Sequence, residues 1–251
     1  LWHYQLTHHD IWDRDIPTAP ILADLTVGGK KIEAVLQLTK QSFAYAFDRV
    51  SGKPIWPIIE DPVPASDVPG EWTSPTQPRP SKPAAYDLQG VTINDLIDFT
   101  PELRAAAIEA VRPFRLSSLW TPPSVQDAPD GTQGTLVAPG SVGGANWEHG
   151  AFDPETGMLY VGSFTNPAVW GLVSDSTKSD MRWIMGNARV PNAQGLPILK
   201  PPYNRITAID MNAGDHRWMV PGGDTPDAIT NHPADRKSTR LNSSHVKRSR
   251  M

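Results

Sequence analysis

The sequence predicts an all-β fold of many short strands with a single helix, and three observations support this prediction. The 26 prolines and 19 glycines in 251 residues interrupt the chain too often for a helical bundle. The hydrophobic fraction of 39% is too high for a disordered chain. A strand-turn-strand pattern also recurs three times. A chain of this length can form one large β domain or two smaller domains.

The recurring pattern places an aspartate before a tight turn, a glycine four residues later, and an apolar or aromatic residue four positions after the glycine. It occurs as AFDRVSGKPIW (residues 46–56), AFDPETGMLYV (151–161) and AIDMNAGDHRW (208–218). We expect Asp48, Asp153 and Asp210 to cap the turns and the glycines to adopt positive φ. Spacings of 105 and 57 residues between these aspartates fit a unit of roughly 50 residues, as in β-propeller blades.

Other segments interrupt these repeats. Residues 62–83 are rich in proline and predict a long surface loop. The segment FTPELRAAAIEAV (residues 99–111) predicts one inserted helix, with Thr100 as N-cap and Pro101 in the first turn. Residues 174–180 and 187–202 predict irregular connectors. Residues 132–154, which lie between the helix and these connectors, again predict strands and turns. Within them, Gly140, Gly143 and Gly144 would allow the backbone to approach a neighbour closely.

A polar cluster, HHDIWDRD (residues 8–15), lies near the start of the chain. Its three carboxylates repel one another, and a buried acid among them must pair, bind a metal or shift its pKa. On a strand, alternate residues share a face, so His8 would pair with Asp10 and not with His9 in a zinc site. The alternative is that these histidines form a hydrogen-bonded wall of a larger site.

Composition excludes several classes of protein. The absence of cysteine excludes a disulfide scaffold and a thiol nucleophile, and no apolar run is long enough to span a membrane. Residues 235–251 resemble a translated sequencing adapter, so we expect a non-native tail after a domain at residues 1–234. Without this tail the chain has 17 basic and 26 acidic residues, a net charge of −9, which argues against binding nucleic acid.

Several motifs together resemble one family. They are WHYQLTHHDIWDRD (residues 2–15), LTKQSFAYAFDRVSGKPI (38–55), SPTQPRPSKP (74–83), TPPS (121–124) and GGANWEHGAFDPETGMLYV (143–161). They resemble the dehydrogenases that use pyrroloquinoline quinone (PQQ), and most of all the glucose-dehydrogenase branch. The resemblance implies an eight-bladed β-propeller of antiparallel four-stranded sheets, of which this chain supplies about half. The chain is then an internal fragment, with any signal peptide or membrane anchor upstream.

The resemblance also implies roles for four residues. Asp13 resembles the catalytic base, which takes the substrate hydroxyl proton, and it could also touch the divalent metal beside the quinone, calcium in the usual case. Lys40 resembles the lysine that contacts the quinone oxygens. Asn146 and Trp147 resemble the pair that lines the cofactor. Taken without this context, Asp13 and Asn146 could be ordinary turn residues and Lys40 an exposed lysine.

The resemblance implies the oxidation of a sugar such as glucose, or of another alcohol, with electrons passing to ubiquinone or to a cytochrome c. A periplasmic location, soluble or tethered to the membrane, follows from the same resemblance. The alternatives are a quinoprotein alcohol or polyol dehydrogenase and a non-catalytic propeller of the cell envelope. A scaffold of that kind has no need of Asp13, Lys40 and Asn146 together.

We predict that residues 1–234 expressed alone are inactive and prone to aggregate, because an incomplete ring leaves open sheet edges and an unclosed central funnel. The measurement is dye reduction with aldoses after addition of PQQ and calcium. Turnover by residues 1–234 would contradict this prediction.

Overall fold

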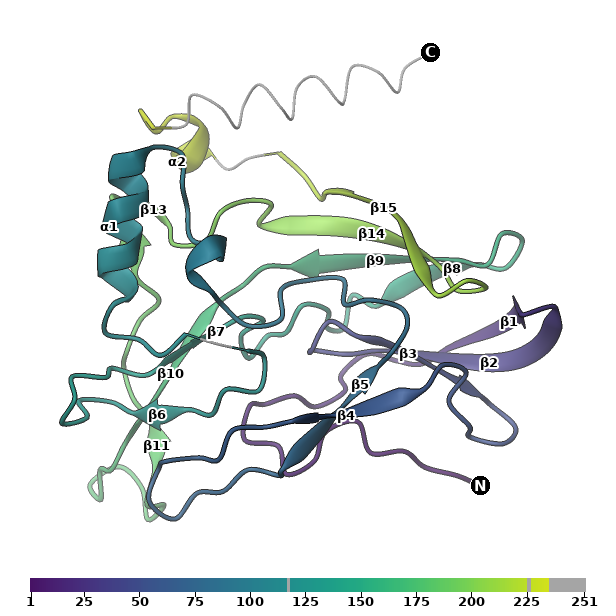
Figure 1. Ribbon diagram of the computed structural model, residues 1–251, viewed down its shortest axis with the longest axis horizontal. Helices are drawn as coiled ribbons and strands as arrows, with labels where there is room; N and C mark the ends of the chain where they lie inside the picture. Colours follow the sequence, from purple (N-terminus) through teal and green to yellow (C-terminus); the bar gives the residue numbers. More distant parts are fainter. Residues whose placement is uncertain (117, 225–226, 235–251) are drawn as a thin grey trace.

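The structure, a computed structural model, describes residues 1–116, 118–224 and 227–234. The predicted non-native tail, residues 235–251, lies outside the described residues. Short strands dominate (Figure 1). The strands are β1 (Ile21–Val27), β2 (Lys30–Leu38), β3 (Ala44–Asp48), β4 (Ile58–Pro62), β5 (Thr76–Pro80), β6 (Ser124–Val125), β7 (Thr135–Val137), β8 (Gly150–Asp153), β9 (Met158–Phe164), β10 (Ala168–Val173), β11 (Ile184–Met185), β12 (Asn192–Ala193), β13 (Leu196–Pro197), β14 (Asn204–Asp210) and β15 (Asp215–Pro221). The helices are α1 (Pro101–Val111), α2 (Asp227–Thr230) and a 3-10 turn, η1 (Ile93–Asp95).

The three predicted turns share one geometry, which confirms the repeat. In each turn the glycine N–H donates to the carbonyl oxygen of the aspartate four residues earlier, over 2.7 to 2.9 Å, and the glycine φ lies between 71° and 74°. Each aspartate side chain accepts hydrogen bonds from the turn that follows it. The residue four positions after the glycine lies on a strand in two cases, Val161 and Trp218. Trp56 was expected on a strand, but it follows a single bridge at Pro54.

Two antiparallel sheets pack face to face and form one part of the core. The first has the order β1-β2-β3 and the second the order β15-β14-β9-β8. Buried residues from both sheets meet between them, among them Leu36, Leu38, Leu159, Val161 and Ile209. The two lie one above the other in Figure 1. This packing fixes the place of the segment that follows β2.

A second four-stranded sheet contains β11, β10 and β6, with β7 also paired to β10. It departs from the purely antiparallel sheets that the resemblance implied, because β6 pairs with β10 in parallel. The stretch of residues 126–167 between these two strands is long enough for the crossover that a parallel pair needs. Helix α1 buries Leu103 and Ala107 in the adjoining core. As predicted, Thr100 caps this helix by accepting the Leu103 N–H at 3.1 Å.

Two loop predictions were partly wrong. Within residues 62–83, β5 forms and pairs antiparallel with β4. A two-stranded ribbon tolerates Pro78 and Pro80 because the N–H groups that they lack are not needed on an edge strand, and the Arg79 guanidinium also binds Asp61. Within residues 187–202, β12 and β13 form a short hairpin around Gly195, which has a φ of 86°. In the part of the chain that is described, no helix is long and apolar enough to cross a membrane.

We predict that the aspartates of the repeat turns make the free energy of unfolding depend on pH. Hydrogen bonds from the Thr156 side chain and the Glu155 backbone lower the pKa of Asp153. Between the lowered pKa of the folded state and the ordinary aspartate pKa, the unfolded chain therefore binds more protons than the folded chain. The stabilisation by the Asp153 carboxylate is fully present above the ordinary aspartate pKa, and it is lost as the pH falls through the lowered pKa of the folded state. Urea unfolding should show that Asp153→Asn is less stable than wild type at about pH 6, with the difference shrinking toward about pH 3.

Glu155→Gln is the matched control, because it removes an exposed charge from the same turn. A difference between Asp153→Asn and wild type that stays constant from about pH 6 to about pH 3 would contradict the prediction.

Candidate functional site

The predicted catalytic segment is an irregular loop and not a strand. Asp10 caps it by accepting the backbone N–H groups of Trp12 at 2.8 Å and Arg14 at 2.5 Å. The capped loop buries Trp12 and Arg14 completely. The side chains of Asp13 and Asp15, which alternate with them, are 62% and 58% exposed. The loop thus presents two carboxylates outward from a buried anchor.

Arg14 is part of that anchor and was not among the residues predicted from the sequence to belong to the site. Its guanidinium donates to the carbonyl oxygens of Gly140 at 2.8 Å and Pro139 at 2.5 Å, and it lies 5.3 Å from the centre of the Trp170 ring. Burial lowers the pKa of Arg14 to about 10, although Asp10 and Asp13 oppose the shift. The side chain therefore ties the acidic loop to residues 139–140. An arginine between two exposed acids was the only signal for it in the sequence.

Lys40 lies on a tight turn directly after β2 and reaches the acidic loop. Its side chain is only 9% exposed, and its Nζ lies 3.4 Å from Asp13 Oδ2 and 2.5 Å from Asp15 Oδ1. The structure thus brings two of the predicted residues, Asp13 and Lys40, into one ion-paired cluster. Asp15 belongs to the same cluster and was missed, because its spacing from Asp13 carried no separate signal.

The Gly143–Gly144 backbone packs directly on Lys40. A Cβ at Gly143 would lie 2.5 Å from Lys40 Cγ, and Gly143 has a φ of 82°. The Gly144 N–H donates to the Lys40 carbonyl oxygen at 3.0 Å. The close approach predicted for Gly143 and Gly144 is therefore confirmed: Gly143 approaches Lys40, and Gly144 approaches Ser42 of the same turn.

Asn146 and Trp147 follow this contact on a loop before β8. The Asn146 side chain is engaged by its own loop, since Nδ2 donates to the Val142 carbonyl at 2.7 Å and Oδ1 accepts the Trp147 N–H at 2.9 Å. Thr18, after the acidic loop, donates to the Asn146 carbonyl at 3.1 Å. Trp147 is 79% exposed. The segment is therefore tied to the chain just after the acidic loop through Thr18. The Asn146 amide faces its own loop, and the Trp147 indole faces solvent.

His8 does not pair with Asp10 as a strand would have required, and His9 does not form a metal site with other described residues either. His8 Nε2 lies 3.2 Å from Glu60 Oε1. His9 stacks on Trp72 with a centroid distance of 3.4 Å. Among the described residues, no group of three or more His, Cys, Asp or Glu side chains could hold a metal ion. The alternating-strand geometry was wrong because the Asp10 cap bends the backbone into a loop.

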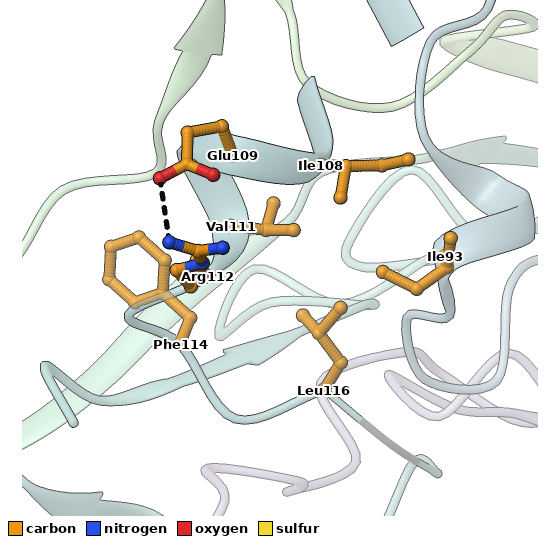
Figure 2. A pocket seen from close by; sticks show the side chains of 7 residues that line it. All are labelled: Ile93, Ile108, Glu109, Val111, Arg112, Phe114 and Leu116. Atoms are coloured by element: carbon orange, nitrogen blue, oxygen red, sulfur yellow. Dashed lines mark ion pairs between the residues drawn. The ribbon is translucent and has the colours of Figure 1, made fainter. Parts of the chain in front are cut away.

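A pocket of about 330 Å³ lies elsewhere, between α1 and η1. Figure 2 shows its lining, with Glu109 and Arg112 joined by an ion pair of 3.3 Å at one side and apolar side chains around the rest. The lining residues are Ile93, Ile108, Glu109, Val111, Arg112, Phe114 and Leu116. None belongs to the cluster around Lys40, so this pocket does not bear on the predicted chemistry.

The chain belongs to the family described as PQQ, glucose/ethanol/alcohol dehydrogenase, β-propeller domain, whose model matches residues 1–249. The described sheets are therefore part of a β-propeller, as predicted. The matched proteins are quinoprotein dehydrogenases, which are oxidoreductases.

Three curated relatives illustrate the range of the family. The chain is 31% identical to the quinate/shikimate dehydrogenase (quinone) of Acinetobacter baylyi over 90% of its own length and 30% of that protein. It is 28% identical to the quinoprotein glucose dehydrogenase of Escherichia coli, over 91% of this chain and 30% of that one. It is 29% identical to the glycerol dehydrogenase large subunit of Gluconobacter oxydans, over 88% and 33%. The chain thus spans about a third of the length of these relatives.

Among solved structures, a europium-containing methanol dehydrogenase matches with a TM-score of 0.49 and 22% identity. This match covers 86% of the chain and 30% of that structure.

The side chains at the cluster fit part of a quinone site. The Lys40 ammonium offers hydrogen-bond donors suited to carbonyl and carboxylate oxygens, and the exposed Trp147 indole offers a flat apolar face. The Asn146 amide is already engaged by its own loop and contributes less. They fit a divalent metal less well, because Asp13 and Asp15 supply carboxylate oxygens from only two residues and calcium takes about six to eight oxygen ligands. The described residues therefore hold at most part of a metal site.

We predict that Gly143→Ala disrupts the site. A methyl group there would meet Lys40 and occupy a left-handed backbone position, so the free energy of unfolding should fall by about 1–3 kcal/mol. Gly162→Ala is the matched control, because a Cβ at Gly162 meets nothing within 4 Å. Urea unfolding of both variants is the measurement, and equal stability of the two would contradict the prediction.

Proposed function

We propose that the protein carrying this chain oxidises a sugar of the glucose type, or another alcohol, with PQQ as its cofactor. The observation that supports the proposal most is the ion pair of 3.4 Å between Lys40 Nζ and Asp13 Oδ2. It joins a carboxylate that is open to solvent to a covered ammonium from a segment 27 positions away. These are the two charges that alcohol oxidation requires, since one group accepts a proton and another stabilises negative charge.

When bound, the quinone supplies an acceptor for the hydride of the alcohol carbon. In this proposal the Asp13 carboxylate takes the hydroxyl proton of the substrate. Lys40 Nζ donates to an oxygen of the cofactor, where its fixed positive charge stabilises developing negative charge. Asp15 keeps the ammonium in place through the 2.5 Å contact. The Trp147 indole would line the cofactor together with Asn146, whose amide is held in place by its bonds to Val142 and Trp147.

The substrate class rests on the relatives. Their names specify quinate, glucose and glycerol, which are all alcohols with several hydroxyl groups. A quinoprotein alcohol or polyol dehydrogenase is therefore the alternative within the same chemistry. Calcium as the metal, ubiquinone or cytochrome c as electron acceptor, and a periplasmic location complete the proposal. A non-catalytic envelope propeller is the rival of a different class, and for it the ion pair would be structural only.

We predict that Asp13→Asn in the complete protein lowers kcat by about 10²–10⁴-fold, because the amide cannot accept the hydroxyl proton. The measurement is dye reduction by protein reconstituted with PQQ and calcium, with glucose, quinate and glycerol as substrates. PQQ binding is measured in parallel through the quenching of tryptophan fluorescence. If Asp13→Asn still binds PQQ, the lower kcat results from loss of the base and not from loss of the cofactor.

Asp24→Asn is the matched control, because Asp24 also forms an exposed ion pair, 3.3 Å from Arg49, away from the cluster. Wild-type kcat in Asp13→Asn would contradict the role of base. Failure of the wild-type protein to bind PQQ would favour the scaffold.

A further inference from the structure

The turn that carries Lys40, residues 39–42, is held by groups from two distant segments. We refer to it as the Lys40 turn. The Thr39 carbonyl accepts the Tyr86 hydroxyl at 2.8 Å, and the Ser42 carbonyl accepts the Tyr86 backbone N–H at 3.0 Å. Gln89 Nε2 donates to the Gln41 carbonyl at 2.6 Å. Since Gly144 donates to the remaining carbonyl, that of Lys40, every carbonyl of the turn is bound from outside it.

Asp87 lies between the two donors Tyr86 and Gln89, and its side chain is only 1% exposed. Its carboxylate accepts the hydroxyl groups of Ser163 at 2.6 Å and Thr165 at 2.8 Å. Arg205 Nη2, on β14, lies 3.4 Å from the same carboxylate. One buried charge therefore fastens the segment of residues 86–89 to the end of β9 and to β14.

The end of β9 also holds the glycine loop. Phe164, between the two residues that bind Asp87, donates its N–H to the Gly144 carbonyl at 3.0 Å. A Cβ built on Gly144 would lie 3.5 Å from Asp87 Cβ and 2.0 Å from Ser42 Oγ. The glycine loop thus packs against Ser42 of the Lys40 turn and lies beside the Asp87 side chain at its Cβ.

A buried charge is costly unless it is fully hydrogen-bonded, and apolar residues of similar volume often stabilise a protein equally well. Satisfied buried networks do rigidify the parts that they join. Asp87 joins residues 86–89 to the end of β9. These two parts in turn bind the segments that carry Lys40 and Asn146, through Tyr86 and Gln89 on one side and Phe164 on the other. A role in aligning these segments would account for a buried charge at this position.

We propose that Asp87 is a positioning residue that sets the Lys40 turn against the Gly143–Asn146 loop and thereby shapes the cofactor site. The inference rests on the proposed function for its ligand, PQQ. Asp87 itself does not touch the cluster of charges, and it acts through Tyr86, Gln89 and the end of β9.

The test compares Asp87→Ala and Asp87→Asn with wild type in the complete protein. Two readouts are used, namely the affinity for PQQ from fluorescence titration and the hydrogen exchange of the Gly144 amide. Asp87→Ala should weaken PQQ binding about tenfold or more, since small misplacements of site groups cost up to about 100-fold. It should also speed exchange at Gly144. Asp87→Asn keeps the shape but replaces one acceptor oxygen with an N–H donor and removes the charge beside Arg205. Its PQQ affinity should therefore lie between those of Asp87→Ala and wild type.

Asp210→Ala is the matched control, because Asp210 is also buried and paired with an arginine, Arg217 at 2.7 Å, on the same sheet. It should lower stability with little change in PQQ affinity or Gly144 exchange. If Asp87→Ala does not fold, Tyr86→Phe decides, because it removes only the bond to the Thr39 carbonyl and should still weaken PQQ binding.

Wild-type affinity and wild-type Gly144 exchange in Asp87→Ala, or wild-type affinity in Tyr86→Phe, would overturn the inference. Equal effects of Asp87→Ala and Asp210→Ala would also overturn it, since the role would then be structural only. If the wild-type protein binds no PQQ, the proposed function fails. Exchange at Gly144 then still decides whether Asp87 aligns the two segments.

Discussion

The close packing of the Gly143–Gly144 backbone on Lys40 is the constraint on which the site depends. It joins segments that are about a hundred residues apart in sequence and leaves no room for a side chain between them. The same contact sets the Lys40 ammonium against the carboxylates of the acidic loop. The sheets on either side of the contact, β1-β2-β3 and β15-β14-β9-β8, hold it in place through their shared core.

Charges in this region divide into two kinds. Arg14 and Asp87 are buried and are compensated by carbonyl and hydroxyl groups, so they serve to join segments. Asp13 and Asp15 are half exposed and share one covered lysine. A buried charge keeps a fixed set of partners because losing one is expensive. Exposed charges can exchange partners with little cost, which is what a group that meets a substrate needs.

The sequence predicted those features that depend on local chemistry. The aspartate and glycine of each turn specify its backbone directly, and Thr100 with Pro101 specifies the start of α1. It did not predict features that depend on distant partners. The strand at Thr76–Pro80 forms only because β4 lies beside it, and the acidic loop bends because Asp10 caps it. The positions of Asp13 and Lys40 were predicted through the resemblance, whereas Asp15, Arg14 and Asp87 became apparent only once the segments were seen together.

The alternation along the acidic loop separates what holds the loop from what it can do. Trp12 and Arg14 face inward and fix the backbone, while the residues at positions 13 and 15 have no part in that anchoring. Replacement of the outward side chains would leave this inward anchor in place. The backbone at Asp13 has a φ of 56°, which favours Asp, Asn or Gly at that position. An insertion or deletion of one residue between Asp10 and Arg14 would instead change the spacing between the Asp10 cap and the buried arginine. The loop therefore depends on the spacing of Asp10, Trp12 and Arg14 as much as on their identities.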